Sequence, residues 1–482
     1  MTGTGGLSHT LSTRQLFLMA FGAAIGVGWL VVVGDWLRLA GPMGTVVGFA
    51  AGALVLSLVC LCYGEMAALF PVAGGEVAYC YETYGLVVGF GVGWFLALAY
   101  LAVTAFEVIS IGWIASALFP GIEGPVLGTV NGSQLTLGGV LLGVAGTLLL
   151  LWVNRRGVKS VARLQDWMTA VLIVASLAFI IVGLGGGSTA NLAPAFQVDA
   201  RGAILPGIIA IFFVTPNWLG GFAFIPQLME ERAPGSPPSR AVMAMVMQVV
   251  LAAVFYSLVT VAVAMAVPRA TLVAGGGLPV ADAFRAAFGS ELLVRAVLLA
   301  GLMGLITTWN AVFLGASRVL FALGRAHIIP KQFGRVDRQS GAPTVAGVFV
   351  ACASMLGILL GRKALLPLLN VVAAVQAGAF VLVAIGVLLL RRRRPDLTRP
   401  YRVPGGAPVA VLAALGSAFA LYLALVEPYR AAGGRIPLEW WLFLGWGAVG
   451  VVFWLAARRI RSDLSEPERR RIVLGQGVEE AT

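Results

Sequence analysis

The chain alternates between long apolar segments and short polar connectors. A helix needs about 20 consecutive, mostly apolar residues to cross the hydrocarbon core of a bilayer. About twelve segments satisfy this requirement, and no connector between them is long enough to hold a soluble domain. The pattern therefore predicts an all-α integral membrane protein with about 12 transmembrane helices. The predicted spans cover residues 15–37, 42–69, 86–118, 134–153, 166–185, 202–229, 241–267, 292–322, 344–361, 365–390, 408–427 and 437–457.

The composition and the charge distribution agree with membrane insertion. Of the 482 residues, 59% are hydrophobic and 11% are charged, whereas soluble domains have about 45–50% apolar and about 25% charged residues. The formal net charge is +12, and basic residues cluster after spans 4, 6, 8, 10 and 12. Because cytoplasmic loops are enriched in Lys and Arg, we expect a multi-pass protein of the cytoplasmic (inner) cell membrane with both termini in the cytoplasm. We expect the lipid bilayer around it and no nucleic-acid partner.

One polar connector is placed by the number of spans alone. The connector 71–84 holds Glu76 and Glu82 but no basic residue, and we expect it on the cytoplasmic side although its charge does not indicate that side. The C-terminal segment 458–482 is rich in charged residues. We expect it to be a frayed cytoplasmic tail.

The first predicted span contains residues that weaken helices. Gly22, Gly26 and Gly28 lie within two helical turns, and glycine allows the backbone to leave helical dihedral angles at little cost. Close packing of a neighbouring helix against Gly22 and Gly26 is an alternative explanation, because small residues four apart are typical of helix contacts in membranes. The spacing in this span alone does not separate a break from close packing.

The sixth predicted span has helix-breaking residues at a corresponding position. Pro216 is followed by Gly220 and Gly221, and proline removes a backbone donor and clashes with the preceding turn. Backbone groups freed inside a membrane need a cavity or a ligand as partner. Interrupted spans at matching positions of two halves are typical of secondary transporters with inverted repeats. We therefore predict breaks near 26–29 and 217–222, with helix amino termini directed at an anionic group of a substrate.

Four motifs resemble those of the amino acid–polyamine–organocation (APC) permeases. They are "GAAIGVGWL" (22–30) with the following "AGPMG", "YGEMAALFPVAGGEVAYCY" (63–81), "GGFAFIPQLMEE" (220–231) and "SRVLFALGRAHIIPKQF" (317–333). The resemblance implies a leucine-transporter-like fold, in which two inverted five-helix repeats with broken helices 1 and 6 precede two further helices. It also implies secondary active import of a small amino acid or related amine by alternating access.

On this fold the chain divides into three parts. The transporter core covers residues 1–400, with repeats at about 15–185 and 202–390. Two additional transmembrane helices lie within 401–457, and 458–482 forms the tail.

The resemblance further implies a substrate site at the two breaks. The first break, whose amides receive the substrate carboxylate in the family, matches Gly26, Val27, Gly28 and Trp29. The second break, whose aromatic residue covers the substrate, matches Gly220, Gly221 and Phe222. Asn217 and Trp218 flank this second break, and a Trp or Phe face there favours an amine through a cation–π contact. Two departures weaken the analogy for the substrate: Trp29 replaces the usual isoleucine, and Ala223 replaces the usual acidic or polar residue.

A carboxyl group also lies inside the third predicted span. Tyr100, Thr104 and Glu107 share one face of this helix because of their spacing. Charged side chains within the membrane are costly and usually face a cavity or a partner. Glu107 therefore meets a substrate amine, carries a coupling proton, or forms a structural hydrogen bond. In span 8, Arg318 and Arg325 are expected to reach the cytoplasmic surface or to close an inner gate.

The coupling ion is predicted from a few polar residues. Glu107 is a candidate proton carrier, and the hydroxyl groups of Thr307 and Thr308 in span 8 are candidates for an ion site. Polar contacts between helices are a common alternative role for such residues. The lysine that some proton-coupled members carry in span 5 has no counterpart in 168–183. We expect a proton gradient in preference to sodium.

Other classes of function are disfavoured by the residues present. Only two histidines occur, His9 and His327, and no HExxH motif or intramembrane catalytic pair is present. We therefore expect no enzyme activity, no metal site and no cofactor. An amine, polyamine or ethanolamine-type permease and a transporter-like sensor without net flux remain as alternatives. We expect a monomer or a homodimer.

Overall fold

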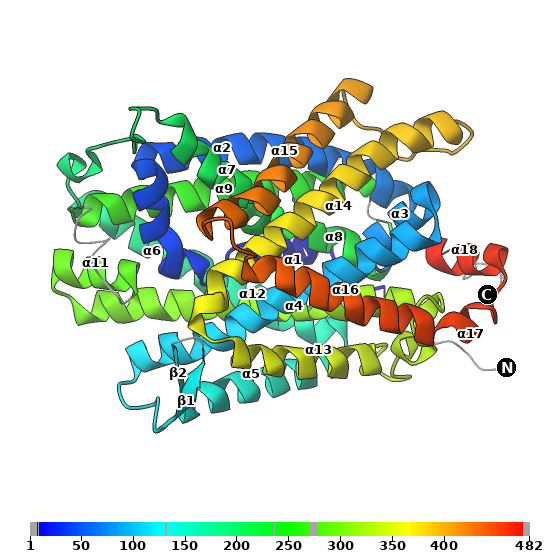
Figure 1. The fold of residues 1–482 in the computed structure, drawn as a ribbon, viewed down its shortest axis with the longest axis horizontal. Coiled ribbons are helices and arrows are strands. Elements are labelled where there is room, and N and C mark those ends of the chain that lie inside the picture. The colour runs from blue at the N-terminus through cyan, green and yellow to red at the C-terminus, as the bar shows by residue number, and fades with distance from the viewer. Residues whose placement is uncertain (1–6, 8, 131–132, 236, 269–277, 476–482) are drawn as a thin grey trace.

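The computed structural model describes residues 7, 9–130, 133–235, 237–268 and 278–475. Within these ranges, ten helical segments are long and apolar enough to cross a membrane (Figure 1). The prediction of a helical membrane protein is confirmed. The long segments are α2 (Gly28–Leu69), α4 (Leu86–Leu118), α5 (Leu137–Arg155), α6 (Val158–Gly186), α7 with α8 (Leu205–Gln227), α9 (Pro238–Ala266), α12 (Glu291–Arg325), α14 (Leu365–Arg393, preceded by η6, Arg362–Ala364), α15 (Ala407–Ala431) and α16 (Leu438–Ala456).

Shorter elements connect or extend these helices. They are α1 (Thr13–Ala24), α3 (Glu76–Tyr84), η1 (Thr189–Leu192), η3 (Met229–Glu231), α11 (Pro279–Phe288), η4 (Lys331–Gly334), α13 (Thr344–Gly357), η5 (Ile358–Leu360), α17 (Arg458–Arg461) and α18 (Glu466–Leu474).

The count of ten differs from the twelve predicted spans for two local reasons. Helix α2 continues from the second half of predicted span 1 into span 2, with a kink at Gly41, where φ is +72°. Glycine tolerates this left-handed conformation, so the chain bends without ending the helix. The predicted span 344–361 is the shorter helix α13 followed by the 3-10 turn η5. The number of twelve membrane crossings therefore remains a prediction.

The helices are interrupted at both predicted places. Helix α1 ends at Ala24 and α2 begins at Gly28. The second interruption separates α7 (Leu205–Leu219) from α8 (Phe224–Gln227) by the 3-10 turn η2 (Gly220–Ala223). A 3-10 segment inside a helix has poorer hydrogen-bond geometry, and Pro216 has already removed one donor of α7.

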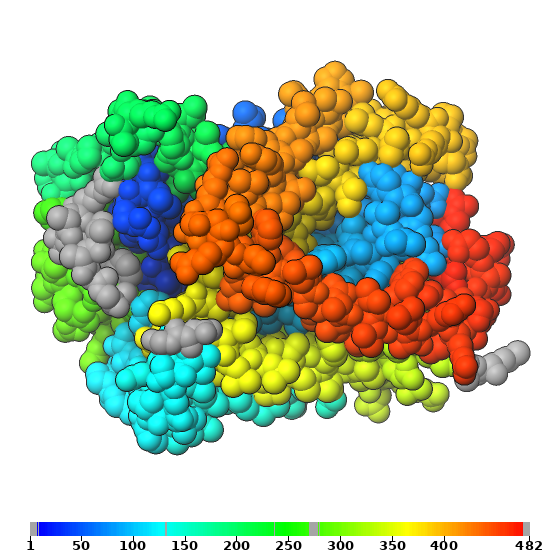
Figure 2. Space-filling model, viewed as in Figure 1, coloured from blue at the N-terminus to red at the C-terminus, as the bar shows by residue number. Residues whose placement is uncertain are grey.

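The helices around these interruptions form the interior of the bundle. Helix α1 packs against α6, α9, α12 and η2, and α12 packs against α4 and α6. The last two long helices lie outside this group: α15 (orange) and α16 (orange-red) cover α14 (yellow) and α4 (light blue) in Figure 2. Large apolar side chains such as Leu54, Val174 and Leu292 are exposed on the long helices, as expected for a surface that contacts lipid.

A small β-hairpin departs from the predicted all-α fold. Strand β1 (Val126–Val130) pairs antiparallel with β2 (Ser133–Thr136), with Val126 opposite Thr136 and a register shift before Gly128. The predicted span 134–153 therefore begins too early, since its first residues belong to β2. β-branched residues and glycine favour strands and turns over helix in this segment.

The polar connector and the tail are more ordered than predicted. Within the connector 71–84, residues from Glu76 onward form helix α3. The predicted fraying of the tail is wrong for α18, which packs on α3 and begins with a capping box between Ser465 and Glu468. Arg470 Nε donates 2.8 Å to Glu82 of α3. The end of the predicted tail, 476–482, lies outside the described residues. Helices α3, α17 and α18 lie together at one end of the bundle, and β1, β2 and α11 lie toward the other (Figure 1).

Candidate functional site

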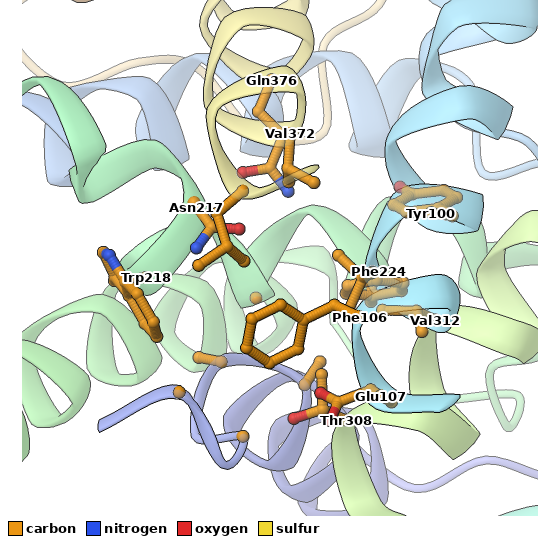
Figure 3. Close-up of a pocket in the computed structure, with 17 residues that line it drawn as sticks. Tyr100, Phe106, Glu107, Asn217, Trp218, Phe224, Thr308, Val312, Val372 and Gln376 are labelled. Carbon is orange, nitrogen blue, oxygen red and sulfur yellow. The ribbon is translucent and has the colours of Figure 1, made fainter. Parts of the chain in front are cut away.

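A cavity lies between the two interruptions, inside the bundle (Figure 3). Its volume of about 40 Å³ has room for about three water molecules. A solute as large as an amino acid therefore requires side chains around the cavity to move. The lining residues are Ala23, Ala24, Gly26, Gly28, Tyr100, Val103, Phe106, Glu107, Asn217, Trp218, Gly221, Phe224, Thr308, Val312, Leu369, Val372 and Gln376.

Side chains from two other helices satisfy the backbone carbonyl groups at the end of α1. The Thr308 hydroxyl donates a hydrogen bond of 2.9 Å to the carbonyl oxygen of Gly22. The Tyr256 hydroxyl donates one of 2.5 Å to the carbonyl oxygen of Ala24. The first amides of α2 have no intrahelical acceptor, because α2 begins at Gly28. The cavity therefore faces a helix amino terminus, which favours an anionic group.

Two glycines allow close contacts at the interruptions. A Cβ atom added to Gly28 would lie 2.2 Å from the Trp218 ring, and one added to Gly221 would lie 2.2 Å from the carbonyl oxygen of Ala20. Both distances are far below van der Waals contact. Any larger residue at either position would force α7 or η2 away from the first interruption.

Glu107 is buried and faces the first interruption. Its Oε1 atom would be 3.3 Å from a Cβ atom added to Gly26, and its Oε2 atom has no hydrogen-bond partner among the described residues. No basic side chain of the described ranges lies within ion-pair distance of this carboxyl group. Figure 3 shows Glu107 and Thr308 beside each other on the side of the cavity next to α1. The arrangement leaves acceptor oxygens directed at whatever occupies the cavity.

Eight of the residues predicted for the substrate or ion site line this cavity. They are Gly26, Gly28, Tyr100, Glu107, Asn217, Trp218, Gly221 and Thr308.

Three predicted residues near the first interruption and on α4 point elsewhere. The Trp29 ring stacks on Phe179 with 5.2 Å between ring centroids. Successive residues of an α-helix are rotated by about 100° about its axis, so Trp29 points in a different direction from Gly28. Val27 is fully buried and packs toward Gly301 of α12. Thr104 accepts a hydrogen bond of 2.8 Å from Ser354 of α13. These three residues do not line the cavity.

Three predicted residues near the second interruption and on α12 also lie away from the cavity. Gly220 faces Gln376 of α14. The Phe222 ring packs against Phe380 at 5.2 Å. The Thr307 hydroxyl donates to the carbonyl oxygen of Gly304 in its own helix at 2.8 Å. The expected covering role of Phe222 therefore has no support in this geometry, and Phe224 lines the cavity instead.

Several residues that line the cavity were not predicted from the sequence. Gln376 is a polar residue in the apolar run "NVVAAVQAGAF" (370–380), and this isolated amide was an available signal. Phe106 and Phe224 carried no such signal, because aromatic residues are common throughout the apolar spans. Phe224 also packs against Tyr100, with 4.9 Å between the centroids of the two tilted rings.

Two ion pairs tie the segment after α8 to α12. Arg318 Nε lies 2.9 Å from Glu231 Oε1, and both side chains are buried. Arg318 therefore does not extend to the surface, and the alternative expectation, that it closes an inner gate, stays a prediction. Arg325 donates to both oxygens of Glu230, at 2.8 and 3.0 Å. Burial alone would raise the pKa of Glu230, but Arg325 and the Ala73 amide bring it below its usual value.

Comparison with known proteins identifies the family. Residues 11–454 match the model of the amino acid permease family. The chain belongs to this family. The family is part of the APC superfamily, so the permease is a multi-pass membrane transporter of small molecules and not an enzyme.

Individual relatives resemble the permease over most of their length. The branched-chain amino acid permease BcaP of Bacillus subtilis is 28% identical and covers 96% of each chain. The methylthioribose transporter of the same species is 26% identical over 94% of each chain. The aspartate–proton symporter of Bacillus subtilis is 24% identical, over 88% of this chain and 80% of the symporter.

Proposed function

We propose that this permease imports a neutral amino acid with an apolar side chain, by alternating access coupled to a proton gradient. The observation that carries the proposal is one cavity with a helix amino terminus at Gly28 and, at Glu107, a buried carboxyl group that has no cationic partner among the described residues. These two features complement the two charges of a zwitterion. An amine without a carboxylate would use only one of them.

The cavity suggests an orientation for the substrate. Its carboxylate binds the amides at the start of α2, where the helix dipole is positive. Its ammonium group binds Glu107, whose Oε1 faces Gly26. The side chain then lies among apolar residues such as Val103, Phe106 and Val312. An apolar lining disfavours a second charge on the substrate.

Two relatives support this assignment by their names. BcaP is named for branched-chain amino acids, and the aspartate–proton symporter is named for coupling to protons. We extend both properties to this permease: an apolar amino acid as substrate and the proton as coupling ion. Thr307 and Thr308 then serve as structural hydrogen-bond donors, and no sodium site is proposed.

The overall arrangement proposed here is that of twelve spans. The transporter core 1–400 contains inverted repeats at about 15–185 and 202–390, and two further helices lie within 401–457. Both termini, including the tail 458–482, face the cytoplasm across the inner membrane. The functional unit is a monomer or a homodimer.

The test is uptake into proteoliposomes with radiolabelled leucine and an inward proton gradient. We expect gradient-dependent accumulation that unlabelled isoleucine and valine inhibit, and that ethanolamine, putrescine and methylthioribose do not. The variant Glu107→Gln should lose most of this uptake, whereas Glu427→Gln, at an exposed ion pair on α15, should retain it. Accumulation of ethanolamine or methylthioribose without leucine uptake would overturn the substrate assignment. Leucine binding without counterflow would indicate a sensor.

A further inference from the structure

A second buried carboxyl group lies outside the cavity. Glu76 is the first residue of α3, and its side chain is fully buried. Its Oε2 atom accepts a hydrogen bond from Nε2 of Gln227, the last residue of α8. Its Oε1 atom has no hydrogen-bond partner among the described residues. Unlike Glu65 and Glu231, which are also buried, Glu76 has no arginine, lysine or histidine within ion-pair distance in the described part of the chain.

The groups around Glu76 are neutral. Each can contribute at most a neutral hydrogen-bond donor, so an ionised carboxylate would be buried without a cation. Burial accordingly raises the pKa of Glu76 to about 8. The groups that face it are Tyr63 from α2, Tyr79 and Cys80 from α3, Tyr100 from α4 and Gln227 from α8.

Glu76 also joins α3 to α8, the short helix that follows the second interruption. A Cβ atom added to Gly75, just before Glu76, would lie 3.0 Å from the carbonyl oxygen of Pro226 in α8. At the other end of α8, Phe224 lines the cavity and packs against Tyr100. The short helix α8 therefore connects the cavity to Glu76. Any change in how α8 packs on α3 therefore alters both the wall of the cavity and the surroundings of Glu76.

We propose that Glu76 is a proton-binding site that couples the proton gradient to opening of the permease at the end that carries α3 and α18. This role rests on the proposed function, because it assumes proton-coupled transport. With its proton bound, the neutral carboxyl group remains buried and holds α8 against α3. When α8 moves away and water enters, the O–H bond breaks and the proton passes to water. The carboxylate cannot be buried again until a proton rebinds, and coupling requires that this proton come from the opposite side of the membrane, by way of the cavity that Tyr100 lines.

This assignment separates two roles for buried carboxyl groups. Glu107 lines the cavity and acts on substrate affinity, whereas Glu76 lies behind α8 and acts on coupling. Replacing Glu76 by glutamine imitates the protonated state permanently. Such a variant should still bind and exchange substrate, but it should no longer use the proton gradient.

The experiment compares two transport measurements on the full chain in proteoliposomes. A gradient of about one pH unit supports about a tenfold accumulation of a solute that moves with one proton. For Glu76→Gln we expect an accumulation ratio close to 1, with leucine counterflow within about twofold of the wild type. Glu82→Gln is the matched control on the same helix, since the Glu82 carboxylate, unlike that of Glu76, has cationic partners, the partly exposed Arg394 and Arg470. It should accumulate leucine like the wild type.

The outcomes distinguish the two proposals. If the wild type accumulates no leucine, the proposed function fails. If the wild type and Glu76→Gln accumulate leucine equally, only the role of Glu76 is overturned.

Infrared difference spectra keep the proposal testable if Glu76→Gln does not fold. In the wild type, the carbonyl band of a protonated carboxyl group should disappear as the pH is raised through about 8. The more conservative variant Glu76→Asp should shift the midpoint of this change. A wild-type spectrum without any such titration would overturn the assignment.

Discussion

The Trp218 ring lies directly against Gly28, so closely that a Cβ atom on Gly28 would be 2.2 Å from it. This contact joins the last turn of α7, before the second interruption, to the residue that begins α2 after the first. The two interruptions are therefore in direct contact at one wall of the cavity. A substitution at Gly28 should therefore displace Trp218, and a substitution at Trp218 should alter the packing around Gly28.

We expect Gly28→Ala to impair transport, because its methyl group must displace the Trp218 indole. Overpacking of this kind costs about 1–3 kcal/mol, so initial leucine uptake should fall about tenfold or more. Gly91→Ala on α4 is the control, since a Cβ atom there meets no atom within 4 Å. Equal uptake by the two variants would contradict the contact. The double variant Gly28→Ala/Trp218→Phe should recover part of the loss.

We expect Glu107→Gln to weaken substrate binding more than it alters protein stability. A hydrogen bond to a charged group contributes about 1.5–3 kcal/mol, which corresponds to about a ten- to hundredfold increase in Kd for leucine. Thermal-shift titration of the purified permease measures this Kd. The folded state without substrate should melt at or above the wild-type temperature, because the variant no longer buries an unpaired carboxylate. An unchanged Kd would exclude Glu107 from the substrate site.

Arg318→Met should destabilise the permease strongly. It leaves Glu231 buried without its cation, and breaking a buried pair in this way costs about 3–5 kcal/mol. The double variant Arg318→Met/Glu231→Gln should regain much of this stability, because no isolated charge remains. Arg430→Ala, which breaks an exposed pair with Glu427, should cost at most about 1 kcal/mol. Melting temperatures of all variants in the same detergent provide the comparison.

Acid should remove the contribution of the Glu230–Arg325 pair. The pKa of Glu230 is lowered from its usual value of 4.5, so the pair stabilises the folded state fully above that value. This stabilisation is lost as the pH falls through the lower, folded-state pKa. The difference in melting temperature between the wild type and Glu230→Gln should therefore be largest at about pH 7 and smaller at about pH 3. A difference that does not depend on pH would contradict the assignment.

Sequence patterns located the interruptions because helix-breaking residues are unusual in apolar spans. Gly28 and Pro216 stand out for a local chemical reason: Gly28 begins α2 after the first break, and Pro216 lies inside α7, one turn before the second break. The hairpin was not predicted because its strands are too short to show a clear alternation of apolar and polar residues, and an apolar helix follows directly. The order of α18 was missed although its start, Ser465 with Glu468 three residues later, is a recognisable capping box.

The orientation of individual side chains at the site depends on geometry that a pattern does not contain. Phe222 and Phe224 are two residues apart, and the 3-10 turn between them rotates side chains differently from an α-helix. Only Phe224 therefore reaches the cavity. Trp29 follows Gly28 by one residue and turns toward Phe179. The role of Gln376 depends on which face of α14 meets η2, and that is decided by the packing of the whole bundle.

The attachment of α18 to α3 offers an optical probe of motion at that end of the bundle. Arg471 is exposed on α18, and the native cysteines Cys60, Cys62 and Cys80 are buried, whereas Cys352 is exposed. A fluorophore on Arg471→Cys in a Cys352→Ser background would thus label one chosen place beside α3. Because the side chain of Arg470, which pairs with Glu82, is 44% exposed, concentrated salt should weaken the attachment. The polarisation of the emitted light should then fall as α18 gains rotational freedom.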